Sequence, residues 1–324
     1  MRDFLARRWF LIVLVGVLGV GFGWSEGVVE AGKWVEPGVV VAGILFLMAL
    51  PLAPQEMWKA VRRPKAVALG IAVNSGLAPL LAWGASWGLV DELAAGMLIV
   101  GAVPCTLSSA TVWTRKAGGN DAVALMVTLL TNLSCVVVTP IWLWAMTGVS
   151  LAEGELSLPR MMGQLSLTVA LPILLAQLVR RLAHWERYEA AWKVPVNVLP
   201  QLGVLLMVMI GAGSSAEKLK TLSNQTLHFT DWAIMLLSVM VVHLLLLCCG
   251  YWCGRLLGLT RADRIAVAFS GSQKTFPIGL SIALSYFTGL AMLPLIAFHV
   301  GQLLLDTLVA DHFLRTAPPN DSPV

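Results

Sequence analysis

A lysine, an amide and several hydroxyls interrupt an apolar stretch towards the end of the chain, Ala266-Val-Ala-Phe-Ser-Gly-Ser-Gln-Lys-Thr-Phe-Pro-Ile-Gly-Leu280. A lysine at the centre of a membrane helix costs about 2.5–3.5 kcal/mol, so Lys274 is expected to face a partner or a wet cavity. Pro277 lacks an N–H and leaves carbonyl groups of the preceding turn free, which protein groups or trapped water must satisfy at membrane depth. The pattern predicts a binding site built into a broken transmembrane helix.

A second segment of the same kind lies in the first half of the chain, Gly101-Ala-Val-Pro-Cys-Thr-Leu-Ser-Ser-Ala-Thr111. Pro104 is expected to break this helix, and four hydroxyl residues follow the break. Paired interrupted segments in the two halves of a chain are typical of secondary transporters, whose solute sites lie near the middle of the bilayer. Where two such helices cross, their loose ends bring partial charges and free carbonyls to one point.

Lys274 has two interpretations. Its ammonium group would fill the volume of a cation at the crossing and serve as a proton carrier or an anion ligand, because burial shifts a lysine's pKa readily. The alternative is a structural ion pair, with Asp306 or with Asp121.

Other polar residues inside apolar segments are weighed in the same way. Asp306 is either a proton site or a group that caps a helix or reaches the membrane surface. For His243 and His299, an interhelical hydrogen bond is favoured over a ligand role. Amides can both donate and accept, which favours them for the site, whereas the serines either bind or allow close helix packing. The predicted binding residues are Asn74, Ser108, Ser109, Thr128, Asn132, Ser270, Ser272, Gln273 and Lys274, with Pro104 and Pro277 as the helix breaks.

The elements that position these residues are membrane helices. The 324 residues are 58% hydrophobic and 12% charged, against about 25% charged in a typical soluble domain. Hydropathy predicts ten spans of about 17–28 residues, at 9–24, 37–53, 65–89, 93–114, 120–147, 160–182, 195–214, 230–254, 264–289 and 291–312. The expected partners are therefore a lipid bilayer and a small-molecule solute, with no nucleic acid.

The charges of the connecting loops support this count. Every connection on the side of the N-terminus carries Lys or Arg, whereas the opposite side has only Lys33, Arg160, Lys218 and Lys220. Because basic loops stay on the cytoplasmic side, the chain is predicted to be a multi-pass protein of the cell membrane with both termini in the cytoplasm.

Ten spans divide into two halves of five, and a repeat with an odd number of spans must be inserted upside down relative to its twin. Polar residues recur about 170 positions apart in the two halves, as a duplicated transporter predicts; the pairs are Asn74 with His243, Thr128 with His299, Asn132 with Gln302 and Pro104 with Pro277. We predict a first repeat over residues 1–158, a second over 159–315 and a disordered tail over 316–324.

At its two broken segments the sequence resembles the bile acid:sodium symporter family, in the branch that contains solute carrier family 10 member 7. The matching residues are Val103-Pro-Cys-Thr-Leu-Ser-Ser-Ala110, Thr114-Arg-Lys-Ala-Gly-Gly-Asn120 and Phe269-Ser-Gly-Ser-Gln-Lys-Thr275 with Gly279. The resemblance implies an all-α membrane protein of ten helices in two inverted five-helix repeats, with broken crossing helices at spans 4 and 9. It also implies a core domain of spans 3–5 and 8–10 and a panel domain of spans 1, 2, 6 and 7.

The resemblance places sodium ligands at Asn74, Ser109, Ala110, Thr128, Phe269 and Gln273. The sequence departs from the family at Ala110 and Phe269, whose side chains cannot bind sodium, so sodium would rest on Asn74, Ser109, Thr128 and Gln273. Sodium coupling in the familiar form is in doubt, and a proton is the alternative coupling ion.

Motifs for nucleotide or metal chemistry are missing from the sequence: it has no P-loop, no H-E-x-x-H and no G-x-G-x-x-G after a strand. We therefore expect no cofactor beyond Na⁺ or H⁺, and no enzyme. The predicted function is secondary active transport of a small organic solute, anionic or amphipathic, by alternating access. The alternative is a non-transporting membrane regulator or sensor that retains the transporter fold.

Overall fold

Helices make up the regular structure of the part of the chain that the computed structural model describes, residues 2–53, 55, 59–147, 157–183, 185, 188–221, 227–287 and 289–316. The helices of the first half are α1 (Arg2–Gly23), α2 (Ser25–Gly32), α3 (Pro37–Ala49), α5 (Pro64–Ile71), η1 (Ala72–Leu77), α6 (Ala78–Ser86), α7 (Asp91–Ala102), α8 (Ser109–Lys116) and α9 (Asp121–Thr147). Those of the second half are α10 (Leu158–Leu165), η2 (Ser166–Ala170), α11 (Leu171–Leu182), α12 (Glu189–Thr221), α13 (Phe229–Leu256), α14 (Arg261–Ser272), α15 (Phe276–Tyr286), η4 (Gly289–Ala291) and α16 (Met292–Arg315).

Six of these helical segments are long and apolar enough to cross a membrane, at 64–86, 121–147, 158–182, 191–220, 229–256 and 289–315. A seventh span arises if Ile12–Gly23 and Ser25–Gly32, which meet at 98°, are counted together. The chain is therefore an all-helical membrane protein. Of the other predicted spans, one falls on the shorter helix α3 and two fall on the interrupted pairs α7/α8 and α14/α15.

Both predicted interruptions are present. Helix α7 ends at Ala102 and α8 begins at Ser109, while α14 ends at Ser272 and α15 begins at Phe276. Pro277 occupies the second position of α15, where a missing N–H costs no helical hydrogen bond. The predicted tail, apart from its first residue, lies outside the described residues.

A π-helical turn, η1, interrupts the helix that carries Asn74. The N–H of Ala78 bonds to the carbonyl of Val73 five residues earlier. The next carbonyl in this pattern is that of Asn74, and its partner would be Pro79, which has no N–H. The Asn74 carbonyl is thereby released from the helix, and π-turns of this kind are frequent at functional sites.

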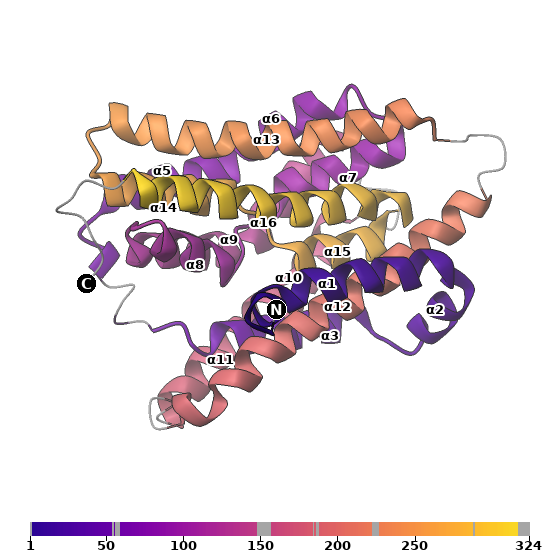
Figure 1. Ribbon diagram of the computed structural model, residues 1–324, viewed down its shortest axis with the longest axis horizontal. Helices are drawn as coiled ribbons and strands as arrows, with labels where there is room; N and C mark the ends of the chain where they lie inside the picture. Colours follow the sequence, from indigo (N-terminus) through magenta and orange to yellow (C-terminus); the bar gives the residue numbers. More distant parts are fainter. Residues whose placement is uncertain are drawn as a thin grey trace.

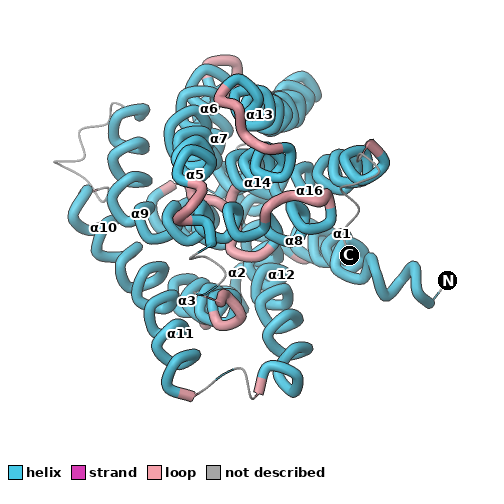
Figure 2. The backbone as a smooth tube through the Cα atoms, turned by 90° about the vertical axis from the view of Figure 1, so that its left-hand side faces the viewer, coloured by secondary structure: helices cyan, strands magenta, loops and turns pink. Residues whose placement is uncertain are grey.

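The helices pack in two groups on either side of the interruptions. Helix α12 contacts α1 and α3, and α3 contacts α11; these helices run obliquely in the lower part of Figure 1, whereas α13 packs along α14 and α16 above them. Figure 2 shows the same separation from the side, with α5 and α7 in the upper group. The second interruption lies at the centre of the molecule, since every residue from Ile265 to Ala283 is buried.

Candidate functional site

The two interruptions touch each other. The N–H of Thr275 donates to the carbonyl of Pro104 at 2.9 Å. The side-chain oxygen of Gln273 accepts from the hydroxyls of Thr106 and Ser109, both at 2.7 Å. Segments some 170 residues apart in the sequence therefore meet at one buried point, which we call the crossing.

Lys274 lies at this crossing with 3% of its surface exposed. Its Nζ atom donates to the carbonyls of Asn74 at 2.6 Å and of Gly101 and Val103 at 2.9 Å each. Three acceptors need three N–H donors, which the ammonium form has and the neutral amine lacks. The site therefore holds a positive charge surrounded by backbone dipoles.

The alternative interpretation of Lys274, an ion pair with Asp306 or Asp121, is excluded. Asp121 binds the exposed Arg115 at 2.8 Å, and the Asp306 carboxylate contacts His243 and Gln273. The released carbonyls around the π-turn and the first break satisfy the ammonium instead, so a carboxylate is not needed.

Two further carbonyls at the first break are bound by side chains of α9. Thr139 donates to the carbonyl of Ala102 at 2.8 Å, and Asn132 donates to that of Cys105 at 2.7 Å. Backbone acceptors that the broken helix leaves free are thus paired inside the protein, as a membrane interior requires.

The second break is held by two amides from other helices. Asn74 Nδ2 lies 3.1, 3.3 and 3.0 Å from the carbonyls of Ser270, Gly271 and Gln273. Gln302 on α16 accepts from the backbone N–H of Lys274 at 2.9 Å and donates to its carbonyl at 3.1 Å. Each break is therefore fixed by amide side chains whose removal would leave buried carbonyls unpaired.

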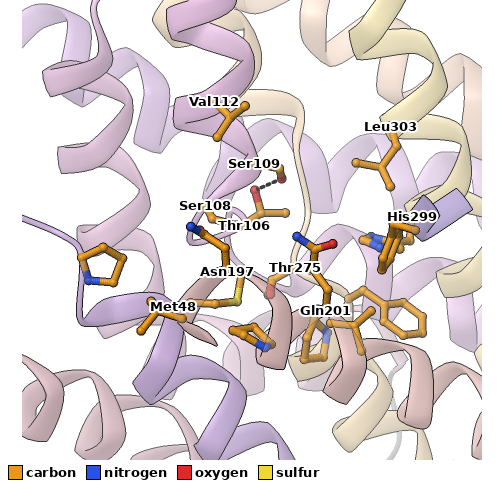
Figure 3. A pocket seen from close by; sticks show the side chains of 17 residues that line it. Met48, Thr106, Ser108, Ser109, Val112, Asn197, Gln201, Thr275, His299 and Leu303 are labelled. Carbon is orange, nitrogen blue, oxygen red and sulfur yellow. Dashed lines mark hydrogen bonds between the residues drawn. The ribbon is translucent and has the colours of Figure 1, made fainter. Parts of the chain in front are cut away.

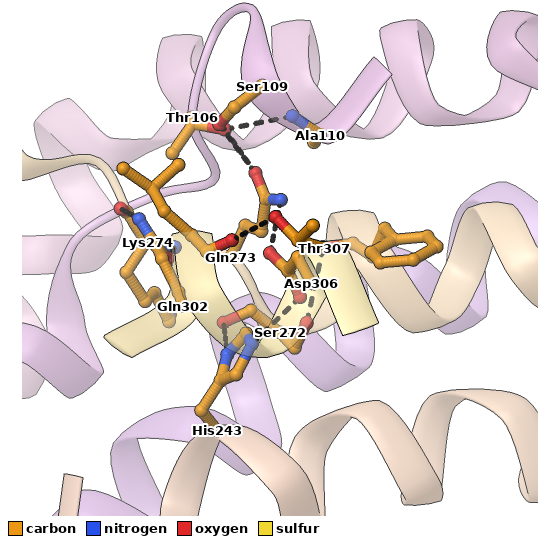
Figure 4. Close-up of polar contacts among 12 residues, drawn as sticks. Thr106, Ser109, Ala110, His243, Ser272, Gln273, Lys274, Gln302, Asp306 and Thr307 are labelled. Atoms are coloured by element: carbon orange, nitrogen blue, oxygen red, sulfur yellow. Dashed lines mark hydrogen bonds and ion pairs between the residues drawn. The ribbon is translucent and has the colours of Figure 1, made fainter. Parts of the chain in front are cut away.

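A polar chain runs from the first break to α13 through Gln273 (Figure 4). Gln273 Nε2 donates to Asp306 Oδ2 at 2.6 Å, and Asp306 Oδ1 lies 2.9 Å from Nε2 of His243. Asp306 and His243 are both completely buried, so of the two interpretations of Asp306, the one in which it caps a helix or reaches the membrane surface is excluded. The interhelical hydrogen bond predicted for His243 is confirmed.

His299 differs from His243. Its Nδ1 atom lies 3.3 Å from the amide of Gln302 one turn away on the same helix, so the interhelical hydrogen bond predicted for it is wrong. Its ring stacks on Phe276 with centroids 5.0 Å apart, and its Nε2 atom is buried without a hydrogen-bond partner.

A cavity of about 310 Å³ lies beside the crossing, between the first break and helices α1, α3, α12, α15 and α16. In Figure 3 Ser108, Ser109 and Thr106 border it on one side, and His299 and Leu303 border it on another. Its polar lining consists of Thr106, Ser108, Ser109, Asn197, Gln201, Thr275 and His299, and the other lining residues are apolar. A cavity with a few hydrogen-bonding groups on an apolar wall is typical of sites for small organic ligands.

The predicted binding residues fall in different places. Ser108 and Ser109 line the cavity, whereas the hydroxyls of Ser270 and Ser272 bond to carbonyls in their own helix, at 2.7 and 3.4 Å. Thr128 lies 3.4 Å from the sulfur of Cys105. The remaining four, Asn74, Asn132, Gln273 and Lys274, hold the crossing together.

Sequence reasoning missed Asn197 and Gln201 on α12, which line the cavity. The two amides are four residues apart and so lie on one face of a helix. Amides at that spacing inside an apolar span are a signal that could have found them.

The residues present do not fit the sodium site that the resemblance implied. Phe269 is fully buried in an apolar cluster with Leu247 and Ala310, and its ring lies 6.3 Å from that of Phe313. Ala110 is buried as well. Neither side chain offers an oxygen, so two of the six sodium ligands that the resemblance implied are missing.

Residues 8–315 match the SBF-like CPA transporter family. The chain belongs to this family. It is 25% identical over 323 residues to sodium/bile acid cotransporter 7 of Rattus norvegicus, covering 94% of this chain and 91% of the relative. Sodium/bile acid cotransporter 7-B of Xenopus laevis is 24% identical with the same coverage of both chains.

A bacterial relative is named "uncharacterized sodium-dependent transporter YocS", from Bacillus subtilis (strain 168); it is 26% identical over 84% of this chain and 81% of its own length. The resemblance drawn from the two broken segments is therefore confirmed, and this SBF-like protein is a membrane transporter of the sodium/bile acid symporter group. Membership of a transporter family agrees with the expectation that it is not an enzyme.

Proposed function

We propose that this SBF-like protein is a secondary active transporter that moves a small amphipathic or anionic organic solute across the membrane by alternating access. The observation that carries the proposal is the cavity of about 310 Å³ beside the crossing. One of its walls is the first helix break, where Ser108 is exposed, and another is α12, which belongs to the other group of helices. A solute held between two groups of helices can favour different relative positions of those groups, as alternating access requires.

The lining supports an amphipathic solute. Phe10, Met48, Val204 and Leu303 provide apolar surface, while hydroxyls and amides provide hydrogen bonds. No carboxylate of a described residue lines the cavity, so an anionic group would meet no repulsion there. Hydroxyl and amide donors suit such a group.

The proposed architecture is ten spans in two inverted repeats of five. Asn132 and Gln302, which the repeat would relate, each bond the backbone of the break in their own half, at Cys105 and at Lys274. The proposed core domain comprises spans 3–5 and 8–10, and the proposed panel domain comprises spans 1, 2, 6 and 7.

Loops expected on the cytoplasmic side lie together. Asn120 donates to Asp263 at 2.8 Å, and its N–H donates to the carbonyl of Ala262. Arg63 lies 3.5 Å from the same aspartate. Three connections that the spans place on one side are thus in contact, which supports the proposed orientation with both termini in the cytoplasm.

The proposed coupling ion is sodium or a proton. Relatives are named for sodium, whereas Phe269 and Ala110 remove two of the expected oxygen ligands. Proton coupling would need an ionisable group at the crossing, where Lys274 and the Asp306–His243 pair are buried.

Uptake into proteoliposomes tests the proposal. Purified protein is reconstituted, and uptake of radiolabelled taurocholate and other organic anions is measured under an inward sodium gradient, a proton gradient or neither. We expect uptake that responds to one gradient, and a several-fold loss in Gln201→Leu but not in Leu202→Ala, whose side chain is 47% exposed on the same helix. A solute that raises the melting temperature without any flux would instead favour the regulator or sensor.

A further inference from the structure

We propose that the Lys274 ammonium is a built-in monovalent cation: it fills a three-carbonyl site at the crossing, and truncating its side chain opens that site to a free cation. The inference deepens the proposed function, but its first test is a binding measurement that does not depend on transport. It concerns the carbonyls of Asn74, Gly101 and Val103, which surround Nζ at 2.6–2.9 Å.

The three carbonyls are available because the backbone breaks in two helices at this point. Pro79 removes the N–H that the Asn74 carbonyl would bond in the π-turn. Gly101 belongs to the last turn of α7, and Val103 follows its end. Carbonyls at a helix C-terminus carry a partial negative charge and attract cations.

Neighbouring carbonyls of α7 and the break already have other partners. That of Ala102 accepts from Thr139, that of Pro104 from the N–H of Thr275 and that of Cys105 from Asn132. The two carbonyls that remain in this run, those of Gly101 and Val103, are the ones that Lys274 binds. We call the carbonyls of Asn74, Gly101 and Val103 the cage. All three are paired when the ammonium is present, and they lack a hydrogen-bond donor when it is absent.

A free monovalent cation is the natural substitute for the ammonium. Selective cation sites in membrane proteins are built from backbone carbonyls that replace the hydration shell of the ion. The carbonyl oxygens of the cage are thus ligands of the kind that bind sodium or potassium. The positive charge that they surround belongs to Lys274 and is covalently attached.

The charge balance of the crossing supports the same conclusion. The hydrogen-bond partners of the Lys274 ammonium are carbonyls and not carboxylates. Phe269, one of the sodium-ligand positions that the resemblance implied, is apolar and buried in an apolar cluster. A protein that carries its own cation needs no oxygen ligand there to hold a diffusible one.

The test compares Lys274→Ala, which empties the cage, with Lys274→Met, which fills it with an uncharged chain of similar length. Melting temperatures are measured in detergent with N-methyl-D-glucamine, sodium, potassium or methylammonium chloride at equal ionic strength. Wild type should melt at the same temperature in each salt. Lys274→Ala should melt lower in N-methyl-D-glucamine and show a saturable rise with at least one small cation, because an ion that binds only the folded state stabilises it. Lys274→Met should show no such rise.

Several results would overturn the inference. One is a Lys274→Ala variant that responds to every salt as Lys274→Met does. Another is a wild type that sodium stabilises as strongly as it stabilises the variant, since the lysine would then not replace the ion. Lys274→Ser serves if the alanine variant cannot be purified, and failure to recover either from potassium-rich buffer would also count against a site that potassium can fill.

Transport supplies a second readout. In proteoliposomes, Lys274→Ala uptake should become dependent on the cation that raises its melting temperature, with a several-fold change between that salt and N-methyl-D-glucamine. If Lys274→Ala has a cation-dependent melting temperature but wild type shows no flux, the inference stands and the proposed function is contradicted.

Discussion

The two helix breaks contain similar types of residue but have different roles. The first break, residues 103–108, reaches the cavity, where Ser108 is exposed and Ser109 is partly exposed. The second break, residues 273–275, is buried throughout and carries the positive charge of Lys274. The comparison teaches that one break presents hydroxyls towards a solute, while the other provides the electrostatic centre around which the first is held.

The largest expected effect concerns the buried acid beside the second break. Replacing Asp306 with alanine should destabilise the protein by about 3–5 kcal/mol, because it leaves His243 and the Gln273 amide buried without their partner. The measurement is the melting temperature in detergent. Asp311→Ala on the same helix is the matched control, since Asp311 is 43% exposed and pairs with an equally accessible Lys116. Equal melting temperatures for the two variants would contradict a structural role for the buried pair.

The next effect compares the amides that pin the two breaks. Asn74→Leu should cost more than Asn132→Leu, because Asn74 faces three carbonyls of the second break and Asn132 binds one of the first. Each carbonyl left unpaired costs about 1–3 kcal/mol. Thermal unfolding of both variants in the same detergent measures the difference. The reverse order would show that the first break, and not the second, is the more tightly held of the two.

A glycine next to the cage provides a steric test. A Cβ atom on Gly101 would lie 2.4 Å from the Ala82 Cβ and 3.1 Å from the Ala78 carbonyl, so Gly101→Ala must push α7 away from α6. We expect a loss of about 1–3 kcal/mol, as is usual for overpacking. Gly84→Ala on α6 is the control, because nothing lies within 4 Å of its added Cβ. The two melting temperatures should differ by several degrees, and no difference would mean that the helices part without cost.

The two helix breaks at the centre of the molecule could be predicted from the sequence, because the bilayer restricts which polar groups can be buried there. A lysine, an amide and a proline in an apolar segment leave few structures that pair every polar group, and both breaks lie where Pro104 and Pro277 indicated. The carbonyl partners of Lys274 were not predicted, because a carboxylate is the obvious counter-ion for an alternative structural role. The released carbonyl of Asn74 depends on a π-turn that hydropathy does not reveal.

Other differences have equally local causes. Hydropathy predicted one span over residues 9–24, but the chain turns by 98° and continues as helix α2. His299 bonds within its own helix because Gln302 lies one turn further along. Span counts and loop charges predict how a chain crosses the membrane, whereas the direction in which a side chain points depends on packing between helices that are distant in sequence.

The smallest expected effects distinguish a serine of the first break from a serine of α14, the helix that precedes the second break. Ser270→Ala removes a hydroxyl that bonds to the carbonyl of Ala266 in its own helix, so it should change stability by about 1 kcal/mol or less and leave solute uptake unchanged. Ser108→Ala alters the exposed wall of the cavity. It should leave the melting temperature unchanged and raise the KM of uptake a few-fold, by removing one hydrogen bond to the solute. Initial rates in proteoliposomes measure both variants, and a larger transport defect in Ser270→Ala than in Ser108→Ala would mean that the solute reaches the end of α14.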